Sequence, residues 1–165
     1  MLGNAEPKTV YLARLKGEPV AAAISTTAPN GYNGNIELIV AVNTDGTVSG
    51  VRQLKHNETP GLGDKIEIRK SDWITGFNGK ELRDEKDSRW GVTKDNGMFD
   101  QFTGATITPR AVVKAVKQTV IYFNQHQQAL FAGGSDNDTG ACRDDDLNYS
   151  LSKSEDQANS QGESE

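Results

Sequence analysis

The chain has 165 residues, which is enough for one domain with a hydrophobic core and too few to indicate two. Its net charge is −5 and its Lys and Arg residues are scattered along the sequence, so a nucleic-acid partner is not expected. Because Cys142 is the single cysteine, one copy of the chain can form neither an internal disulfide nor a cysteine-based metal site.

The first third of the chain predicts an antiparallel sheet of four or more strands. Lys16-Gly17-Glu18 and Asp45-Gly46 are turn signals of the kind that join two strands of a hairpin. A Gly/Asn-rich stretch over residues 29–35 is expected to be a loop. The strands are expected at residues 9–15, 19–24, 36–42 and 47–54.

The middle of the chain has weaker patterns. Residues 65–77 have apolar residues near helical spacing, interrupted at Ser71-Asp72, so we expect two short helical turns. Residues 90–94 are expected to form a strand, after which Asp95-Asn96-Gly97 turns the chain toward residues 98–102.

A long helix is predicted from Pro109 to about Phe131. Thr108 followed by Pro109 is the usual pair for an N-cap and a first helical position. The N-terminus of this helix would then point its free amides and positive dipole end at residues 103–106, which favours a phosphate group there. The predicted buried face consists of Val112, Val113, Val116, Val120 and Phe123.

The end of the chain is polar. Gly133-Gly134 would stop the helix, and residues 135–165 contain too few apolar residues to offset the entropy of ordering, so we predict a largely disordered tail. Residues 1–8 are expected to be an N-terminal segment, and residues 9–134 the domain. His126, late on the helix, is expected to have a surface or capping role. No metal site is predicted, since the acidic residues of the tail do not match a calcium loop.

The stretch Thr103-Gly104-Ala105-Thr106 is the main functional signal. Gly104 and Ala105 leave the Thr106 hydroxyl with little steric cover. On local features alone, the string is also consistent with a plain turn closed by a capping threonine. It resembles the (Ser/Thr)-Gly-Ala-Thr motif, preceded by Asp, of the FMN-binding domain family of bacterial respiratory membrane complexes. Asp100 would be the preceding acid, one residue further away than in the tightest form of the pattern.

A second stretch, from His56 to Gly63, strengthens this resemblance. Taken alone, it is a loop with Pro60 and two glycines ahead of a helical turn. The same family carries His-x-Glu-Thr-Pro-Gly-Leu-Gly at this distance before its threonine motif, and this chain matches it throughout. The loop at residues 31–34 is also placed as the family places it.

The expected elements predict an α+β fold, with helices packed against an antiparallel sheet. The resemblance implies that this single domain binds FMN. It implies that FMN is joined to Thr106 through a phosphoester bond. Around the phosphate it implies Thr103, Gly104, Ala105 and Thr108. Near the ring it suggests His56, Glu58, Thr59, Gly61 and Leu62. From the sequence alone, His56 is also consistent with a loop histidine whose hydrogen bonds are satisfied.

Within the family, the pattern most resembles the G subunit of the Rnf (also called Rsx) ion-translocating complex. The C subunit of the sodium-pumping NADH:quinone reductase is the nearest alternative. The resemblance implies an electron-transfer subunit rather than an enzyme on its own, working with other subunits at the bacterial inner membrane. It also implies a flavin transferase that uses FAD and magnesium for maturation, and a domain facing the periplasm.

No apolar run in this sequence is long enough to span a bilayer, and residues 1–8 are not a signal peptide, so the chain as written is expected to be soluble. The family's N-terminal membrane helix is therefore absent from this sequence. Two other functions stay open: a binding module without FMN, and a flavin domain of a larger reductase. Motifs for hydrolases, zinc proteases and nucleotide binding are missing.

Overall fold

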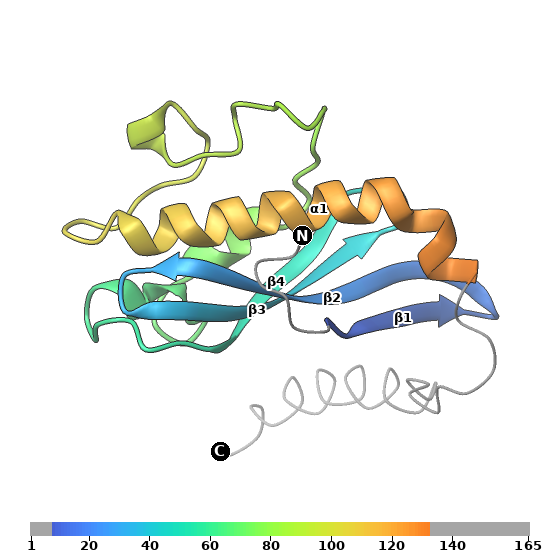
Figure 1. The fold of residues 1–165 in the computed structure, drawn as a ribbon, viewed down its shortest axis with the longest axis horizontal. Helices are drawn as coiled ribbons and strands as arrows, with labels where there is room; N and C mark the ends of the chain where they lie inside the picture. The colour runs from blue at the N-terminus through green and yellow to red at the C-terminus, as the bar shows by residue number, and fades with distance from the viewer. Residues whose placement is uncertain (1–7, 133–165) are drawn as a thin grey trace, which may run out of the picture. The chain divides into compact units, whose positions relative to one another are not determined.

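The computed structural model describes residues 8–132. Its sheet has four antiparallel strands in the order of the sequence: β1 (Val10–Leu15), β2 (Glu18–Gly31), β3 (Gly34–Asn43) and β4 (Val48–Lys55). The helix α1 (Ile107–Ala132) runs along one face of this sheet, mainly over β2 (Figure 1). The predicted α+β architecture is confirmed.

Between β4 and α1 the chain forms short 3-10 turns rather than strands. These turns are η1 (Gly63–Ile66), η2 (Trp73–Phe77) and η3 (Thr93–Asp95). The first two correspond to the two helical turns expected in residues 65–77. The strand expected at residues 90–94 is wrong, because only Val92 makes a bridge, to Phe99, and the chain then enters η3. Burial of Trp90, Val92 and Phe99 explains the strand-like apolar pattern without a sheet.

The turns of the sheet follow from local chemistry. Lys16 and Gly17 both have positive φ, which gives the two-residue turn between β1 and β2. At the next hairpin, Asp45 Oδ1 accepts hydrogen bonds from the Thr47 amide and hydroxyl, and Gly46 has a φ of +85°. Asp and Gly therefore act here as the sequence predicts.

The loop expected over residues 29–35 is largely strand. β2 continues to Gly31 and β3 begins at Gly34, so only Tyr32 and Asn33 form the tip of the hairpin. Pairing across the sheet overrides the weak strand propensity of Asn and Gly. The extended hairpin carries its tip toward the loop that follows β4, where Glu58 accepts hydrogen bonds from the Tyr32 and Asn33 amides.

The core lies between the sheet and α1. Alternate residues of β2 and β3, such as Ile24, Leu38 and Val40, are fully buried on the helix-covered face. They meet the predicted valine stripe of α1, whose members are all buried: Val112, Val113, Val116, Val120 and Phe123. Burial of this stripe fixes the direction of α1 and therefore the position of its N-terminus.

Some predictions fall outside the described residues. These are the tail at residues 135–165, Cys142 and the N-terminal segment before residue 8. Within residues 8–132, no helix is both long and apolar enough to cross a membrane. His126 lies at the surface of α1, as expected, with Nδ1 2.8 Å from the Tyr122 carbonyl oxygen.

Candidate functional site

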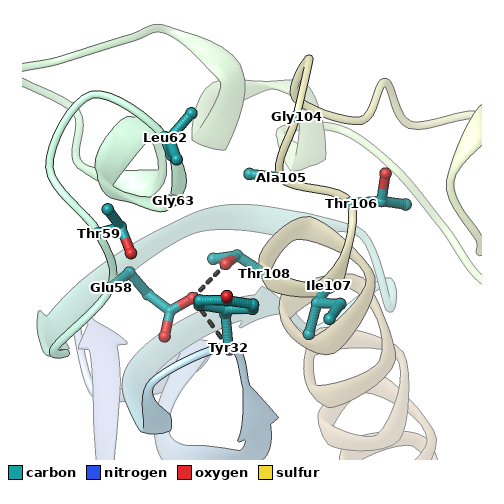
Figure 2. A pocket seen from close by; sticks show the side chains of 10 residues that line it. All are labelled: Tyr32, Glu58, Thr59, Leu62, Gly63, Gly104, Ala105, Thr106, Ile107 and Thr108. Carbon is teal, nitrogen blue, oxygen red and sulfur yellow. Dashed lines mark hydrogen bonds between the residues drawn. The ribbon is translucent and has the colours of Figure 1, made fainter.

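The two sequence motifs meet in one pocket of about 250 Å³, at the N-terminus of α1 (Figure 2). Three segments form it: the tip of the β2–β3 hairpin, the loop after β4, and the turn that leads into α1. The lining residues are Tyr32, Glu58, Thr59, Leu62, Gly63, Gly104, Ala105, Thr106, Ile107 and Thr108. Residues about 50 positions apart in the sequence are thus brought together.

Thr106, not Thr108, occupies the N-cap of α1. Its carbonyl oxygen accepts the first helical hydrogen bond from the backbone amide of Arg110, at 3.2 Å, and the helix begins at Ile107. The predicted capping role of Thr108 and the start at Pro109 are therefore wrong. Because all of the first amides of a helix lack intrahelical acceptors, proline is tolerated throughout the first turn and does not mark a single position.

This helix start leaves polar groups available to a ligand. Within residues 8–132, no group accepts a hydrogen bond from the Ile107 or Thr108 amides, and the Thr106 hydroxyl has no hydrogen-bond partner. Thr106 is partly exposed, and Figure 2 shows its side chain turned away from Glu58. Unpaired amides at a helix N-terminus favour an anion, and the adjacent hydroxyl is open to modification.

The turn before α1 is narrow and depends on glycine. Ala105 N donates to the Phe102 carbonyl oxygen at 3.1 Å, and the reversal places Gly104 at a φ of +77°. A side chain at Gly104 would meet only Leu62 Cδ2, at 3.8 Å. Thr103 is exposed on this turn and is not among the lining residues.

Glu58 is a buried residue of the pocket, with 5% of its surface exposed, and its carboxylate contacts the other two segments. Its Oε2 accepts hydrogen bonds from the Tyr32 amide at 3.1 Å and from the Thr108 hydroxyl, and its Oε1 accepts from the Asn33 amide at 2.9 Å. These three donors replace the water that the carboxylate has lost on burial. Glu58 thereby connects the hairpin tip to the first turn of α1.

The loop after β4 wraps closely around this carboxylate. The Thr59 carbonyl oxygen accepts from the amides of Leu62 and Gly63, each at 3.1 Å, and Gly61 supplies a φ of +77°. A Cβ at Gly63 would lie 2.8 Å from Thr108 Oγ1 and 2.9 Å from Glu58 Cβ. Gly63 therefore allows the contact between Glu58 and Thr108. Gly61 faces outward and does not line the pocket.

His56 stabilises the loop after β4 through hydrogen bonds made outside the pocket. Its Nδ1 accepts a hydrogen bond from the Glu58 amide at 3.0 Å, so the ring proton resides on Nε2, which donates to Glu67 Oε1 at 3.1 Å. The His56 side chain is 10% exposed and does not line the pocket. In this structure His56 orients the backbone at Glu58.

Three large apolar side chains are exposed around the pocket. Tyr32 is 66% exposed, Leu62 42% and Ile107 46%. Such exposure around a concave site is typical of a surface that binds an apolar group. Figure 2 shows Tyr32 beside Glu58 at the bottom of the view, with Leu62 and Ala105 above them.

An exposed ion pair fixes the outer side of the first helical turn. Arg110 Nε and Nη2 donate to the two carboxylate oxygens of Asp95 at 2.7 and 2.8 Å. These hydrogen bonds from Arg110 lower the pKa of Asp95. The pair ties α1 to η3 in a bidentate arrangement.

Most of the predicted site residues lie in this pocket, while His56, Gly61 and Thr103 lie beside it. Sequence reasoning missed Tyr32, Gly63 and Ile107 as lining residues. Tyr32 had a signal, because it belongs to the Gly-Tyr-Asn-Gly turn, and Gly63 ends the matched loop motif. Ile107 gave no separate signal. No cluster of three or more potential metal ligands occurs within residues 8–132.

The fold and the pocket define a small α+β domain that presents a free hydroxyl and unpaired amides at a helix N-terminus beside exposed apolar side chains. A family model described as FMN-binding domain matches residues 31–121, more than half of the chain, and the chain belongs to this family. The matched range contains both motifs and the hairpin tip.

The chain is similar to curated proteins that are each named as the G subunit of an ion-translocating oxidoreductase complex. The relative from Shewanella loihica is 62% identical over 130 residues, which cover 79% of this chain and 61% of the relative. The relative from Vibrio cholerae is 60% identical over 129 residues, which cover 78% of this chain and 62% of the relative. The chain thus spans about three fifths of the length of these relatives.

A solved structure shares the fold. The crystal structure of Shewanella oneidensis NqrC aligns with a TM-score of 0.54 and 29% sequence identity, and the alignment covers 72% of this chain and 60% of that one. Identity to the G-subunit relatives is about twice as high.

Proposed function

We propose that this chain is the flavin-carrying domain of an electron-transfer subunit, with FMN joined to Thr106 through its phosphate. The observation that carries the proposal is the unpaired Thr106 hydroxyl at the N-cap of α1, beside the free amides of Ile107 and Thr108. Family membership supports FMN as the cofactor.

The residues present fit both ends of FMN. For the phosphate, the two free amides supply donors and the positive end of the helix dipole favours the negative charge. A Cβ at Gly104 would meet only Leu62 Cδ2, at 3.8 Å, so the turn leaves room beside the amides. For the ring, the pocket offers the apolar surfaces of Leu62 and Ile107. Thr103 and Ala105 shape the turn around the phosphate.

The loop after β4 would complete the site in two ways. Thr59 and Leu62 line the pocket directly and would contact the cofactor. Glu58, His56 and Gly61 would act through position: the first two by the hydrogen bonds that hold the loop, and Gly61 by its positive φ. Thr108 would hold the helix start through its bond to Glu58.

Attachment from FAD would form a bond between Thr106 Oγ1 and the FMN phosphorus and break the pyrophosphate bond, releasing AMP. The hydroxyl proton would be removed by the flavin transferase, which would supply the magnesium. When bound, FMN supplies the redox chemistry through its isoalloxazine ring, and the ester leaves that ring unmodified. The protein contributes position and a tether that prevents loss of the cofactor.

The G-subunit relatives support a place in an Rnf-type ion-translocating complex. The domain would then carry electrons between other subunits at the bacterial inner membrane, on the periplasmic side, anchored by a membrane helix outside this sequence. The alternative is the corresponding subunit of a sodium-pumping quinone reductase, which the likeness to NqrC favours. The higher identity to the G-subunit relatives is the reason for our preference.

The proposal is tested by producing the chain together with a flavin transferase and measuring its intact mass after denaturation. Wild type is expected to gain the mass of FMN less one water and to remain yellow through acid precipitation. Thr106→Val, which keeps the size but removes the hydroxyl, is expected to stay unmodified, and Thr106→Ser to be modified. Unmodified wild type, or modified Thr106→Val, would overturn the proposal.

A further inference from the structure

Tyr32 occupies an unusual position at the tip of the β2–β3 hairpin. Its side chain is 66% exposed, yet it lines the pocket at the start of α1. We infer that Tyr32 forms the aromatic wall against which the flavin ring packs, and that Glu58 positions it there. This inference rests on the proposed function and adds a ring-contacting residue to it.

The loop after β4 holds the hairpin tip by three hydrogen bonds. The Tyr32 and Asn33 amides donate to the two oxygens of the Glu58 carboxylate at 3.1 and 2.9 Å. Asn33 Nδ2 also donates to Thr59 Oγ1 at 3.0 Å. The tip is therefore joined to the loop after β4 by side-chain hydrogen bonds that span the pocket wall.

The same carboxylate also holds the helix that would carry the cofactor. Glu58 Oε2 accepts a hydrogen bond from the Thr108 hydroxyl, and Thr108 lies two residues after Thr106. Consequently, one buried side chain sets the position of Tyr32 relative to the proposed attachment point. A ring tethered at Thr106 would meet the Tyr32 side chain in a reproducible place, as preorganised sites require.

The hairpin itself has little freedom. A Cβ at Gly31 would lie 2.5 Å from the Gly34 carbonyl oxygen, and Gly34 has a φ of +111°. The close approach of the Gly31 and Gly34 backbones keeps the hairpin tip narrow. Of its two tip residues, Tyr32 and Asn33, only Tyr32 carries a large apolar side chain. An aromatic side chain on a rigid turn at low conformational cost is well suited to stacking on a flat ligand.

The exposure of Tyr32 has no explanation in the folding of the domain. An exposed ring contributes little to the core, and the aromatic contacts of the core involve other residues, such as Phe77 and Phe99 at 4.4 Å between ring centroids. Tyr32 instead lies with Leu62 and Ile107 around one opening. An isoalloxazine ring would cover these apolar surfaces when bound.

Flavin fluorescence tests the contact directly. A phenol in van der Waals contact with an excited flavin transfers an electron to the flavin, and the electron then returns to the phenol. The flavin emission is therefore quenched without net oxidation of either group. Phenylalanine has the same shape but is a much poorer donor. In flavin-loaded protein, with emission normalised to the amount of attached flavin found by intact mass, Tyr32→Phe is therefore expected to raise the fluorescence yield and lengthen the lifetime severalfold.

Two other tyrosines provide matched controls. Tyr11 is exposed on β1, and Tyr122 stacks on His126 along α1, and neither lines the pocket. Tyr11→Phe and Tyr122→Phe are expected to leave the emission as in wild type. Tyr32→Trp, which keeps an electron-rich ring, is expected to remain quenched.

The positioning role of Glu58 is tested in the same assay. In Glu58→Gln, one carboxylate oxygen is replaced by an NH2 group, which cannot accept a hydrogen bond from the Tyr32 amide, the Asn33 amide or the Thr108 hydroxyl. The variant should therefore release the hairpin tip and raise the emission of the attached flavin, although Tyr32 is still present. Combined with Tyr32→Phe, it should add little further. Fully attached flavin whose emission is unchanged in Tyr32→Phe would overturn the assignment alone, whereas an unmodified wild type would overturn the proposed function as well.

Discussion

Thr108 donates a hydrogen bond to the carboxylate of Glu58, a residue 50 positions earlier in the chain. Both side chains are buried, at 1% and 5% exposure. The bond joins the loop motif to the threonine motif, and the amides of the hairpin tip bind the same carboxylate. The two motifs therefore form one structural unit in this domain.

Removing the Thr108 hydroxyl is expected to destabilise the domain. Thr108→Val keeps the shape but leaves a buried carboxylate oxygen without one of its donors, which costs about 1–3 kcal/mol. Urea denaturation measures the loss. Thr108→Ser, which keeps the donor, should retain most of the stability. Equal stability of the valine and serine variants would show that the hydrogen bond contributes nothing.

Gly63 is expected to tolerate no side chain. Gly63→Ala would place Cβ 2.8 Å from Thr108 Oγ1 and 2.9 Å from Glu58 Cβ, so the contact between these two side chains would have to open. Overpacking of this kind costs about 1–3 kcal/mol. Gly76→Ala is the matched control, since a Cβ there meets nothing within 4 Å. Comparison of the two thermal midpoints checks the prediction, and a similar shift in both would contradict it.

Gly104 is needed for its backbone conformation rather than for space. Its φ of +77° would cost an alanine roughly 1–2 kcal/mol, although its Cβ would have room. Gly104→Ala should therefore lower both the stability and the fraction of protein that a flavin transferase modifies at Thr106. Gly104→Asn should lose less, because asparagine tolerates this region. Denaturation curves and intact masses are the measurements, and an alanine variant better modified than the asparagine variant would refute the argument.

Asp87 is expected to make stability sensitive to acid. Its carboxylate accepts hydrogen bonds from Arg89 Nε at 2.9 Å and from Arg89 Nη2 at 2.6 Å, and these bonds hold the pKa of Asp87 well below its ordinary value. Because the folded-state pKa is lowered, the stabilisation is fully present above the ordinary pKa near 3.8 and is lost as pH falls below it.

The measurement for Asp87 is the stability difference between wild type and Asp87→Asn as a function of pH. It should be constant near neutrality and shrink as the pH drops below about 4. Asp72→Asn serves as the control, because the Asp72 side chain makes no capping hydrogen bond. A difference for Asp87 that does not vary with pH would show that the ion pair does not contribute.

Local patterns predicted most of the fold. The turn residues Asp45 and Gly46 and the valine stripe of α1 predicted the sheet and the covering helix, because turns and amphipathic helices are determined by neighbours in the sequence. The strand expected at residues 90–94 failed, since the buried Trp90 and Val92 pack into the core without pairing in a sheet. The predicted start of α1 at Pro109 was wrong because proline is allowed at several positions of a first helical turn.

The sequence by itself determined which residues are available to the pocket, since the hydroxyl of Thr106, the small Gly104 and Ala105, and the loop from His56 to Gly63 are features of composition and order. Only the tertiary structure decided how they meet. The buried carboxylate of Glu58 needs several donors, and these come from a hairpin tip and from a helix far along the chain. No local pattern specifies such a set of partners, so the places of Tyr32 and Gly63 in the pocket are decided only when the chain folds.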